Sequence, residues 1–92
     1  MVDVIKRDGR REPFTPEKIT VSAMKSGAPQ EDARKIAEAV ERVAHDGMTT
    51  EEIRRRVLAQ LREMNPRWEQ HWLMYDAAVK KREAVEPELP AR

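Results

Sequence analysis

Proline and glycine divide this chain into short segments that no single helix can run through unbroken. Pro16, Pro29 and Pro66 each lie at the start of a segment with helical periodicity, whereas Gly27 and Gly47 each follow one. Proline suits the first turn of a helix, where its missing N–H needs no partner, and glycine suits the left-handed residue after a helix. The spacing therefore predicts four short helices packed as a bundle, rather than one or two long helices.

The first residues predict strands instead. Residues 2–7 are β-branched and partly alternating, and Asp8-Gly9 is a favoured two-residue hairpin turn because glycine tolerates positive φ. The return strand, residues 10–14, contains Pro13, which cannot donate a ladder hydrogen bond and belongs at a sheet edge. We expect a mainly α fold, in which about four short helices are capped by an N-terminal β-hairpin or a small three-stranded sheet. The sequence does not place a third strand.

Capping residues and apolar spacing define the expected helices further. The Thr15 hydroxyl is expected to cap the first helix. Thr49 and Glu52 form a capping-box pattern, with Met48 and Ile53 placed to meet as a hydrophobic staple. In the fourth helix, aromatic residues recur at helical spacing from Trp68 onward. This pattern predicts a core or interface surface rather than a platform on which a base stacks. The expected buried faces are Ile19, Ala23 and Met24; Ala33, Ile36, Ala37, Val40, Val43 and Ala44; Ile53, Val57, Leu61 and Met64; and Trp68, Trp72, Tyr75 and Val79.

The length of 92 residues suits one small domain. We expect residues 1–83 to form that domain, and residues 84–92, which lack periodicity, to be a disordered tail or the stub of a linker. Charged residues make up 38% of the chain but the net charge is only +1, so any anion binding needs a local cluster. Cysteine is absent and no apolar run approaches the roughly 20 residues that span a bilayer, which predicts a cytoplasmic protein without a membrane partner.

Positive side chains surround the predicted hairpin turn. Lys6, Arg7, Arg10 and Arg11 flank it, and Lys18 follows in the first helix. Arginine grips phosphate oxygens bidentately and lysine adds a compact charge, so this cluster suits a polyphosphate. By spacing alone, a solvated charged hairpin is an equally good interpretation.

The sequence carries none of the other common site patterns. The glycines, at positions 9, 27 and 47, form no phosphate-loop or dinucleotide-binding motif. His45 and His71 belong to no metal-ligand or catalytic spacing, so we assign no metal ligand. We also find no nucleophile with an adjacent base, and therefore expect no catalytic residue and no enzyme activity.

Residues 4–19, VIKRDGRREPFTPEKI, closely resemble the opening of the ATP-cone domain. Residues 46–53 and the restart at Asn65-Pro66 are similar to later elements of that domain, so the likeness covers residues 2–82. ATP-cone domains lie at the N-terminus of many ribonucleotide reductases and in the bacterial repressor of reductase genes. The resemblance implies a regulatory module that binds ATP or dATP, usually with Mg²⁺, between a lid and a helical bundle.

The resemblance also implies roles for particular residues. Lys6 and Arg7 would hold the triphosphate. Glu12, Thr15 and Lys18 would line the nucleoside end, where Glu12 accepts a hydrogen bond from the adenine amino group. The remaining implied ligands are Thr50 and Arg54 from the third helix and Lys81 or Arg82 from the fourth.

For two of these residues, a structural role is an alternative to nucleotide binding. Thr50 can cap the third helix, and Glu12 can pair with Lys6 or Arg10 across the hairpin. Thr15 stands where many relatives carry Asp or Asn, so the preference between ATP and dATP stays open.

The leading hypothesis is a module in which bound nucleotide shifts the conformation, and with it self-association or contact with a ribonucleotide-reductase-related partner. A small nucleic-acid-binding protein using Arg10, Arg11 and residues 54–56 is an alternative, although the balanced charge argues against direct DNA binding. A third hypothesis is a helical adaptor that has lost nucleotide binding, with a partner surface formed by Trp68, Trp72 and Leu73.

Overall fold

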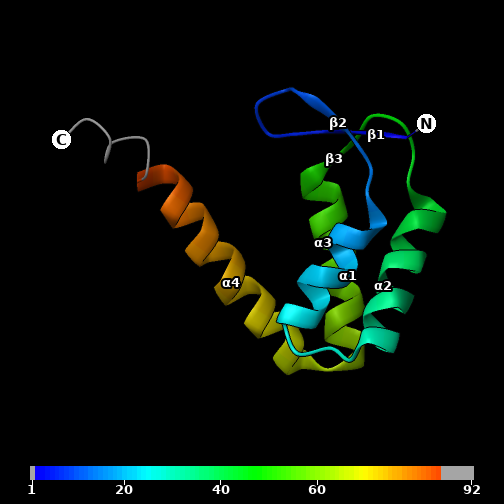
Figure 1. The fold of residues 1–92 in the computed structure, drawn as a ribbon, viewed down its shortest axis with the longest axis vertical. Coiled ribbons are helices and arrows are strands. Elements are labelled where there is room, and N and C mark those ends of the chain that lie inside the picture. The colour runs from blue at the N-terminus through cyan, green and yellow to red at the C-terminus, as the bar shows by residue number, and fades with distance from the viewer. Residues whose placement is uncertain (1, 86–92) are drawn as a thin grey trace.

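The computed structural model describes residues 2–85, and for residues 79–85 the backbone alone. In this part of the chain, Figure 1 shows a small sheet across one end of three packed helices, with a fourth helix leaning away from them. The predicted mainly α fold, a helical bundle with a small N-terminal sheet, is therefore confirmed. The elements in chain order are β1 (Asp3–Ile5), β2 (Arg11–Pro13), α1 (Pro16–Lys25), α2 (Gln30–Val43), β3 (Met48–Thr49), α3 (Thr50–Met64) and α4 (Pro66–Val85).

The sheet has β1 at its centre, in the order β2-β1-β3. Val4 of β1 lies opposite Glu12 of the antiparallel β2 and opposite Met48 of the parallel β3. β3 consists of Met48 and Thr49, which the sequence indicated only as the residues that lead into the third helix. Because a two-residue strand has no periodicity of its own, only its pairing with β1 identifies it.

The hairpin loop is longer than the predicted two-residue turn. The Gly9 N–H donates to the Lys6 carbonyl (2.9 Å) and the Lys6 N–H donates to the Arg10 carbonyl (2.8 Å), so Arg7, Asp8 and Gly9 form a three-residue loop. Gly9 has a φ of 90°, the left-handed conformation that closes such loops. Asp8 and Gly9 are at the turn as predicted, but the predicted length is wrong because the Asp-Gly pair does not itself fix the register.

Two predicted helix ends differ from the structure. Thr15 has an extended backbone and its hydroxyl donates to the Pro13 carbonyl (3.3 Å), so it makes no side-chain cap for α1. α2 ends at Val43, before Gly47, so the prediction that Gly47 ends this helix is wrong. Gly47, with a φ of 88°, instead donates its N–H to the Asp3 carbonyl (2.9 Å) and leads the chain into β3.

The end of α1 is confirmed at Gly27. This residue has a φ of 114°, and the N–H groups of Gly27 and Ala28 donate to the carbonyls of Met24 (3.0 Å) and Ala23 (3.1 Å). This pair of bonds is the Schellman motif, which satisfies carbonyls that a helix end leaves free. A Cβ added at Gly27 would also lie 3.0 Å from the Trp68 ring, so a side chain there would have to displace that ring.

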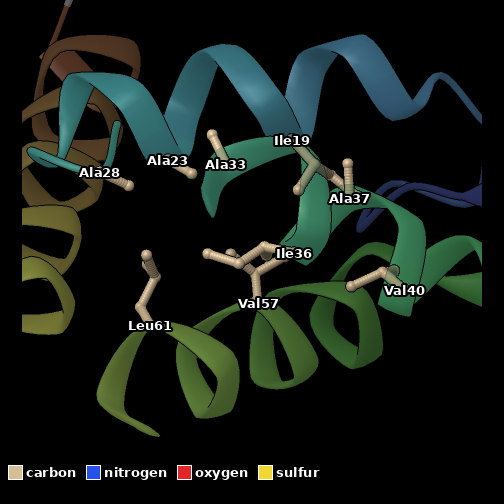
Figure 2. Packing of buried hydrophobic residues seen from close by; sticks show 9 residues of the cluster. All are labelled: Ile19, Ala23, Ala28, Ala33, Ile36, Ala37, Val40, Val57 and Leu61. Carbon is tan, nitrogen blue, oxygen red and sulfur yellow. The ribbon is translucent and has the colours of Figure 1, made fainter. Parts of the chain in front are cut away.

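The core lies between α1, α2 and α3 (Figure 2). Three residues expected there are exposed instead: Met24 (44%), Val43 (43%) and Met64 (38%). Val43 and Met64 are the last residues of their helices, and Met24 lies beside Ala23 on α1, so all three fall outside the narrow contact stripes. The buried cluster consists of Ile19, Ala23, Ala28, Ala33, Ile36, Ala37, Val40, Val57 and Leu61.

α4 contacts the bundle through its first turns and then diverges from it (Figure 1). Trp68 packs against the core, and the His71 ring Nδ1 lies 3.1 Å from the Ser26 carbonyl oxygen. α4 continues to Val85, two residues beyond the predicted domain end at 83. The rest of the predicted tail, residues 86–92, lies outside the described residues. In the described part of the chain, no helix combines the length and apolarity that crossing a membrane requires.

Asp46 connects the approach to β3 with both other strands. Its Oδ1 accepts the Asp3 N–H (3.0 Å), and its Oδ2 accepts an N–H of the Arg11 guanidinium (3.0 Å). The Asp3 N–H bond, and with it the Arg11 charge, lowers the pKa of the Asp46 carboxyl below its ordinary value of 3.8.

This lowered pKa predicts a pH dependence of stability. The Asp46 carboxylate stabilises the fold above its unfolded pKa of about 3.8, and this contribution disappears as the pH falls through the lower folded pKa. We expect Asp46→Asn to destabilise the protein at neutral pH and to reduce the loss of stability at acid pH. Urea unfolding between neutral and acid pH measures both effects. Glu41→Gln, which changes an exposed carboxylate of α2, is the control, and equal pH slopes for wild type and Asp46→Asn would contradict the assignment.

Candidate functional site

A cavity of about 290 Å³ lies between the hairpin loop and the helices α1, α3 and α4. We call it the Arg7 cavity. Four of the residues implied as nucleotide ligands line it: Arg7 from the loop, Lys18 from α1, and Thr50 and Arg54 from α3. The remaining lining residues are Ile19, Ser22, Glu51, Ile53, Val57, Trp72 and Asp76.

A smaller cavity of about 130 Å³ adjoins it on the side of β2. We call it the Glu12 cavity. Glu12 and Thr15, implied at the nucleoside end, line it together with apolar side chains that include Phe14. The two cavities share the residues Lys18, Ile19, Thr50 and Ile53, so they are two parts of one continuous surface.

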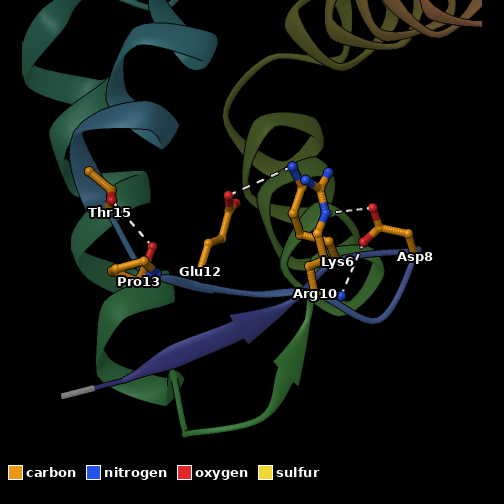
Figure 3. A network of polar contacts seen from close by, with 6 residues as sticks. All are labelled: Lys6, Asp8, Arg10, Glu12, Pro13 and Thr15. Atoms are coloured by element: carbon orange, nitrogen blue, oxygen red, sulfur yellow. Dashed lines mark hydrogen bonds and ion pairs between the residues drawn. The ribbon is translucent and has the colours of Figure 1, made fainter.

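The hairpin carries four cations, and three of them are paired with carboxylates. Arg10 Nε lies 2.7 Å from Asp8 Oδ2, and Lys6 Nζ lies 3.8 Å from Glu12 Oε2 (Figure 3). The backbone N–H of Arg10, and with it the Arg10 side chain, lowers the pKa of the Asp8 carboxyl. The third paired cation is Arg11, which contacts Asp46 and Asp3. The hairpin is therefore partly the charged, self-paired structure that the sequence left open as an alternative.

Arg7 differs from its three neighbours. In the described part of the chain, neither Arg7 nor Lys18 has an ion-pair partner, although both are exposed and both line the Arg7 cavity. The first turn of α3 begins at Thr50 on the shared surface, and a helix N-terminus presents unpaired N–H groups. Two uncompensated cations and a helix N-terminus make this surface suited to an anion.

The structure separates the alternative roles of Thr50 and Glu12. The cap of α3 is Thr49, whose Oγ1 accepts the Glu52 N–H (3.1 Å), so Thr50 does not cap the helix. The Glu52 carboxylate lies 3.6 Å from His45 Nε2. Glu12 does pair with Lys6, as the structural alternative predicted, but the contact is long and both side chains are more than a third exposed. Water screens such a pair strongly, so it holds the Glu12 carboxylate only weakly.

Arg54 is the most constrained cation of the Arg7 cavity. Its Nε lies 3.1 Å from Asp76 Oδ2 on α4, and its Nη1 lies 3.3 Å from Glu51 Oε1 on α3. The guanidinium also lies over the Trp72 ring, 5.5 Å from the ring centre. The sequence did not identify Asp76 as a site residue, because no local spacing connects it with Arg54.

Trp72 serves both the core and the cavity wall. Its ring packs against the buried cluster, which confirms the predicted packing role for Trp68 and Trp72. Its indole Nε1 is buried and has no hydrogen-bond partner in the described part of the chain. Tyr75, expected on the same buried face, is 44% exposed and its hydroxyl instead lies 3.2 Å from Lys25 Nζ.

Two implied ligands stand apart from these residues. Lys6 lines neither cavity and faces Glu12 (Figure 3). Lys81 lies in α4 beyond the residues whose side chains the structure describes. Among the described residues, no group of three or more His, Cys, Asp or Glu side chains could hold a metal ion.

Comparison with known proteins gives a family match. The family model described as the ATP cone domain matches residues 2–84. A search among curated proteins gives no match.

Proposed function

The chain belongs to the ATP-cone domain family, whose members are nucleotide-binding regulatory modules, and from this premise we propose that it binds ATP or dATP across the two adjoining cavities. The observation that carries the proposal is the pair Arg7 and Lys18, which lack ion-pair partners in the described residues and line the larger cavity. Cations of this kind bind a polyphosphate favourably, because the phosphates supply the negative charge that the fold does not place beside them.

The phosphates would occupy the Arg7 cavity. Arg7 binds them from the loop, and Lys6 joins it by giving up its long contact with Glu12. Thr50 adds its backbone N–H and its hydroxyl at the start of α3, and Arg54 approaches from the same helix. Lys81, on α4, completes the set of cations as a proposed ligand. Mg²⁺ would arrive with the nucleotide, bound to the phosphates.

The nucleoside would occupy the Glu12 cavity. Phe14 and Ile53 supply apolar walls, and Glu12, Thr15 and Lys18 supply the polar groups. The Glu12 carboxylate, held only by the weak Lys6 pair, accepts a hydrogen bond from the adenine amino group. Guanine carries a carbonyl oxygen where adenine carries that amino group, so the same carboxylate disfavours GTP.

The elements that line the site support a regulatory role. The Arg7 cavity, at about 290 Å³, is just below the roughly 300–1,000 Å³ typical of ligand sites, and the Glu12 cavity adjoins it. Its walls belong to the hairpin loop, α1, α3 and α4, so a bound nucleotide changes how these elements are placed relative to one another. The resulting shift of population would alter self-association or contact with a ribonucleotide-reductase-related partner, without catalysis by this domain.

Of the alternatives, nucleic-acid binding loses part of its basis. Arg54 belongs to the cavity wall and is held by Asp76 and Glu51, whereas Arg55 and Arg56 are exposed. The hairpin residues Arg10 and Arg11, needed as phosphate contacts in that hypothesis, are already paired with carboxylates. The fold therefore offers a nucleic acid fewer uncompensated charges than the sequence suggested.

Thermal unfolding tests the proposal directly. With Mg²⁺ and nucleotide at about 100 times Kd, binding stabilises a folded state by about 2.7 kcal/mol. For a domain of this size we expect a rise in Tm of roughly 10–20 °C with ATP or dATP. GTP at the same concentration is the control and should give a much smaller shift. An unchanged Tm at millimolar ATP, together with no heat in a calorimetric titration, would refute nucleotide binding.

A further inference from the structure

Two carboxylates already occupy N–H groups of the Arg54 guanidinium that a phosphate would use. The Nε contacts Asp76 and the Nη1 contacts Glu51, at 3.1 and 3.3 Å. A guanidinium grips an oxyanion bidentately through Nε with one terminal nitrogen, or through its two terminal nitrogens. The grip through Nε needs the single Nε–H, which now faces Asp76, whereas Nη1 carries two N–H groups and can keep its contact with Glu51. Arg54 therefore has to release Asp76 before it can grip a phosphate group through Nε.

The two carboxylates differ in what they connect. Glu51 lies three residues before Arg54 on the same helix, so breaking this contact leaves the tertiary structure unchanged. Asp76 lies on α4, and its contact with Arg54 ties α4 to α3 at the edge of the cavity. The Asp76 pair is also the less exposed one, with side chains 26% and 21% exposed, so water screens it less than the Glu51 pair.

We propose that Asp76 is a positioning residue that lowers the affinity of the site for nucleotide phosphates, by competing with them for Arg54 and repelling them directly. This inference rests on the proposed function and describes how the same site is regulated. Because the competing carboxylate belongs to α4, phosphate that captures Arg54 also removes one contact between α4 and α3. Nucleotide binding and the Arg54–Asp76 contact therefore oppose each other, and by linkage each weakens the other equally.

Trp72 supports the same conclusion from the side of α4. Its ring holds the Arg54 guanidinium at the cavity edge, where it can turn between Asp76 and a phosphate. Its buried Nε1 has no acceptor among the described residues. An unsatisfied buried donor costs free energy, so it offsets part of the stability that the contact between α4 and the bundle contributes.

Calorimetric titration of the full chain with Mg-ATP and Mg-ADP tests the proposal. We expect Asp76→Asn to tighten ATP binding about fivefold or more, and ADP binding by a smaller factor because ADP carries less charge. Asp76→Glu, which keeps the charge, should bind like the wild type. Glu69→Gln is the matched control, since it removes one negative charge from α4 away from the Arg7 cavity and should leave the affinity unchanged.

Two further measurements identify the cause of any gain. In an Arg54→Ala background, Asp76→Asn should tighten ATP binding clearly less than in the wild type, because the competition has gone and only direct repulsion remains. Hydrogen exchange of the α4 amides without nucleotide should be faster in Asp76→Asn than in Glu69→Gln, because α4 has lost a tie to α3.

The outcomes separate this inference from the function on which it rests. A wild type that does not bind ATP refutes the proposed function and the competition together. A wild type that binds ATP, with Asp76→Asn unchanged or weaker, refutes only the competition; weaker binding assigns Asp76 to the ligand or its Mg²⁺ instead. An equal gain in the Arg54→Ala background would show that Asp76 does not act through Arg54.

Discussion

Arg7→Ala is expected to weaken ATP binding by roughly tenfold to a hundredfold. A hydrogen bond to a charged group contributes about 1.5–3 kcal/mol, and each 1.4 kcal/mol changes Kd tenfold. Arg7 has no carboxylate partner in the described residues, so its removal deletes a phosphate contact without releasing a competing charge. Titration calorimetry with Mg-ATP at fixed salt measures the loss, while the stability of the nucleotide-free protein should hardly change.

Arg10→Ala provides the matched control on the same hairpin. Arg10 carries the same charge at the loop, but its side chain is 72% exposed, paired with Asp8, and absent from both cavities. Its removal should change ATP affinity less than about threefold, through long-range charge alone. If Arg7→Ala and Arg10→Ala weakened binding equally, the hairpin would attract phosphate only as a diffuse positive region, and the specific role of Arg7 would be wrong.

Leu61→Ala is expected to lower the free energy of unfolding by about 2–5 kcal/mol. Leu61 is fully buried where α3 meets α1 and α2 (Figure 2), so its removal leaves a cavity that the surrounding backbone cannot fill. Small domains have total stabilities near the low end of about 5–15 kcal/mol, so this single change threatens the fold itself. Urea unfolding followed by tryptophan fluorescence gives the free energy.

Leu73→Ala is the control for the same chemical change. Leu73 lies on α4 with 38% of its surface exposed, and it is not part of the buried cluster. The change should lower stability by less than about 1 kcal/mol. A large loss at Leu73 with a small loss at Leu61 would mean that the core lies between α4 and its neighbours, contrary to the structure described.

The helices could be predicted from the sequence because their signals are local. Pro16 fixes the start of α1, and Gly27 ends it because the left-handed backbone there suits glycine. Thr49 caps α3 through a bond to an N–H three residues away. Each of these features depends on residues within one helical turn of each other, so the amino-acid order alone specifies them.

Features that depend on distant residues could not be predicted in the same way. β3 exists because Met48, from the middle of the chain, pairs with Val4 near its start. Met24 is exposed because the neighbouring helices reach Ala23 beside it and not Met24 itself. Periodicity gives the apolar side of a helix to within about one residue on either side, and the contacts between helices decide which of those residues is buried.

The residues of the candidate site also differ in whether the sequence could indicate them. The resemblance of residues 4–19 to a known family singled out Arg7, Glu12 and Lys18, and the structure brings all three to adjoining cavities. It did not indicate Asp76, because this residue becomes relevant only when α4 folds back beside α3. Nor does the sequence distinguish Arg7, which has no carboxylate partner among the described residues, from Arg10, which has one.

The sequence by itself determined where the four helices begin, where α1 ends, which family the chain resembles, and which types of charged residue surround the hairpin. Only the tertiary structure decided which of those charges are already neutralised and which face a cavity. The physical reason is that helix ends depend on bonds over a few residues, whereas the state of a charge depends on whichever carboxylate the fold brings within about 4 Å. Arg54 and Asp76 are such a pair, since they come from different helices and meet only once the bundle has formed.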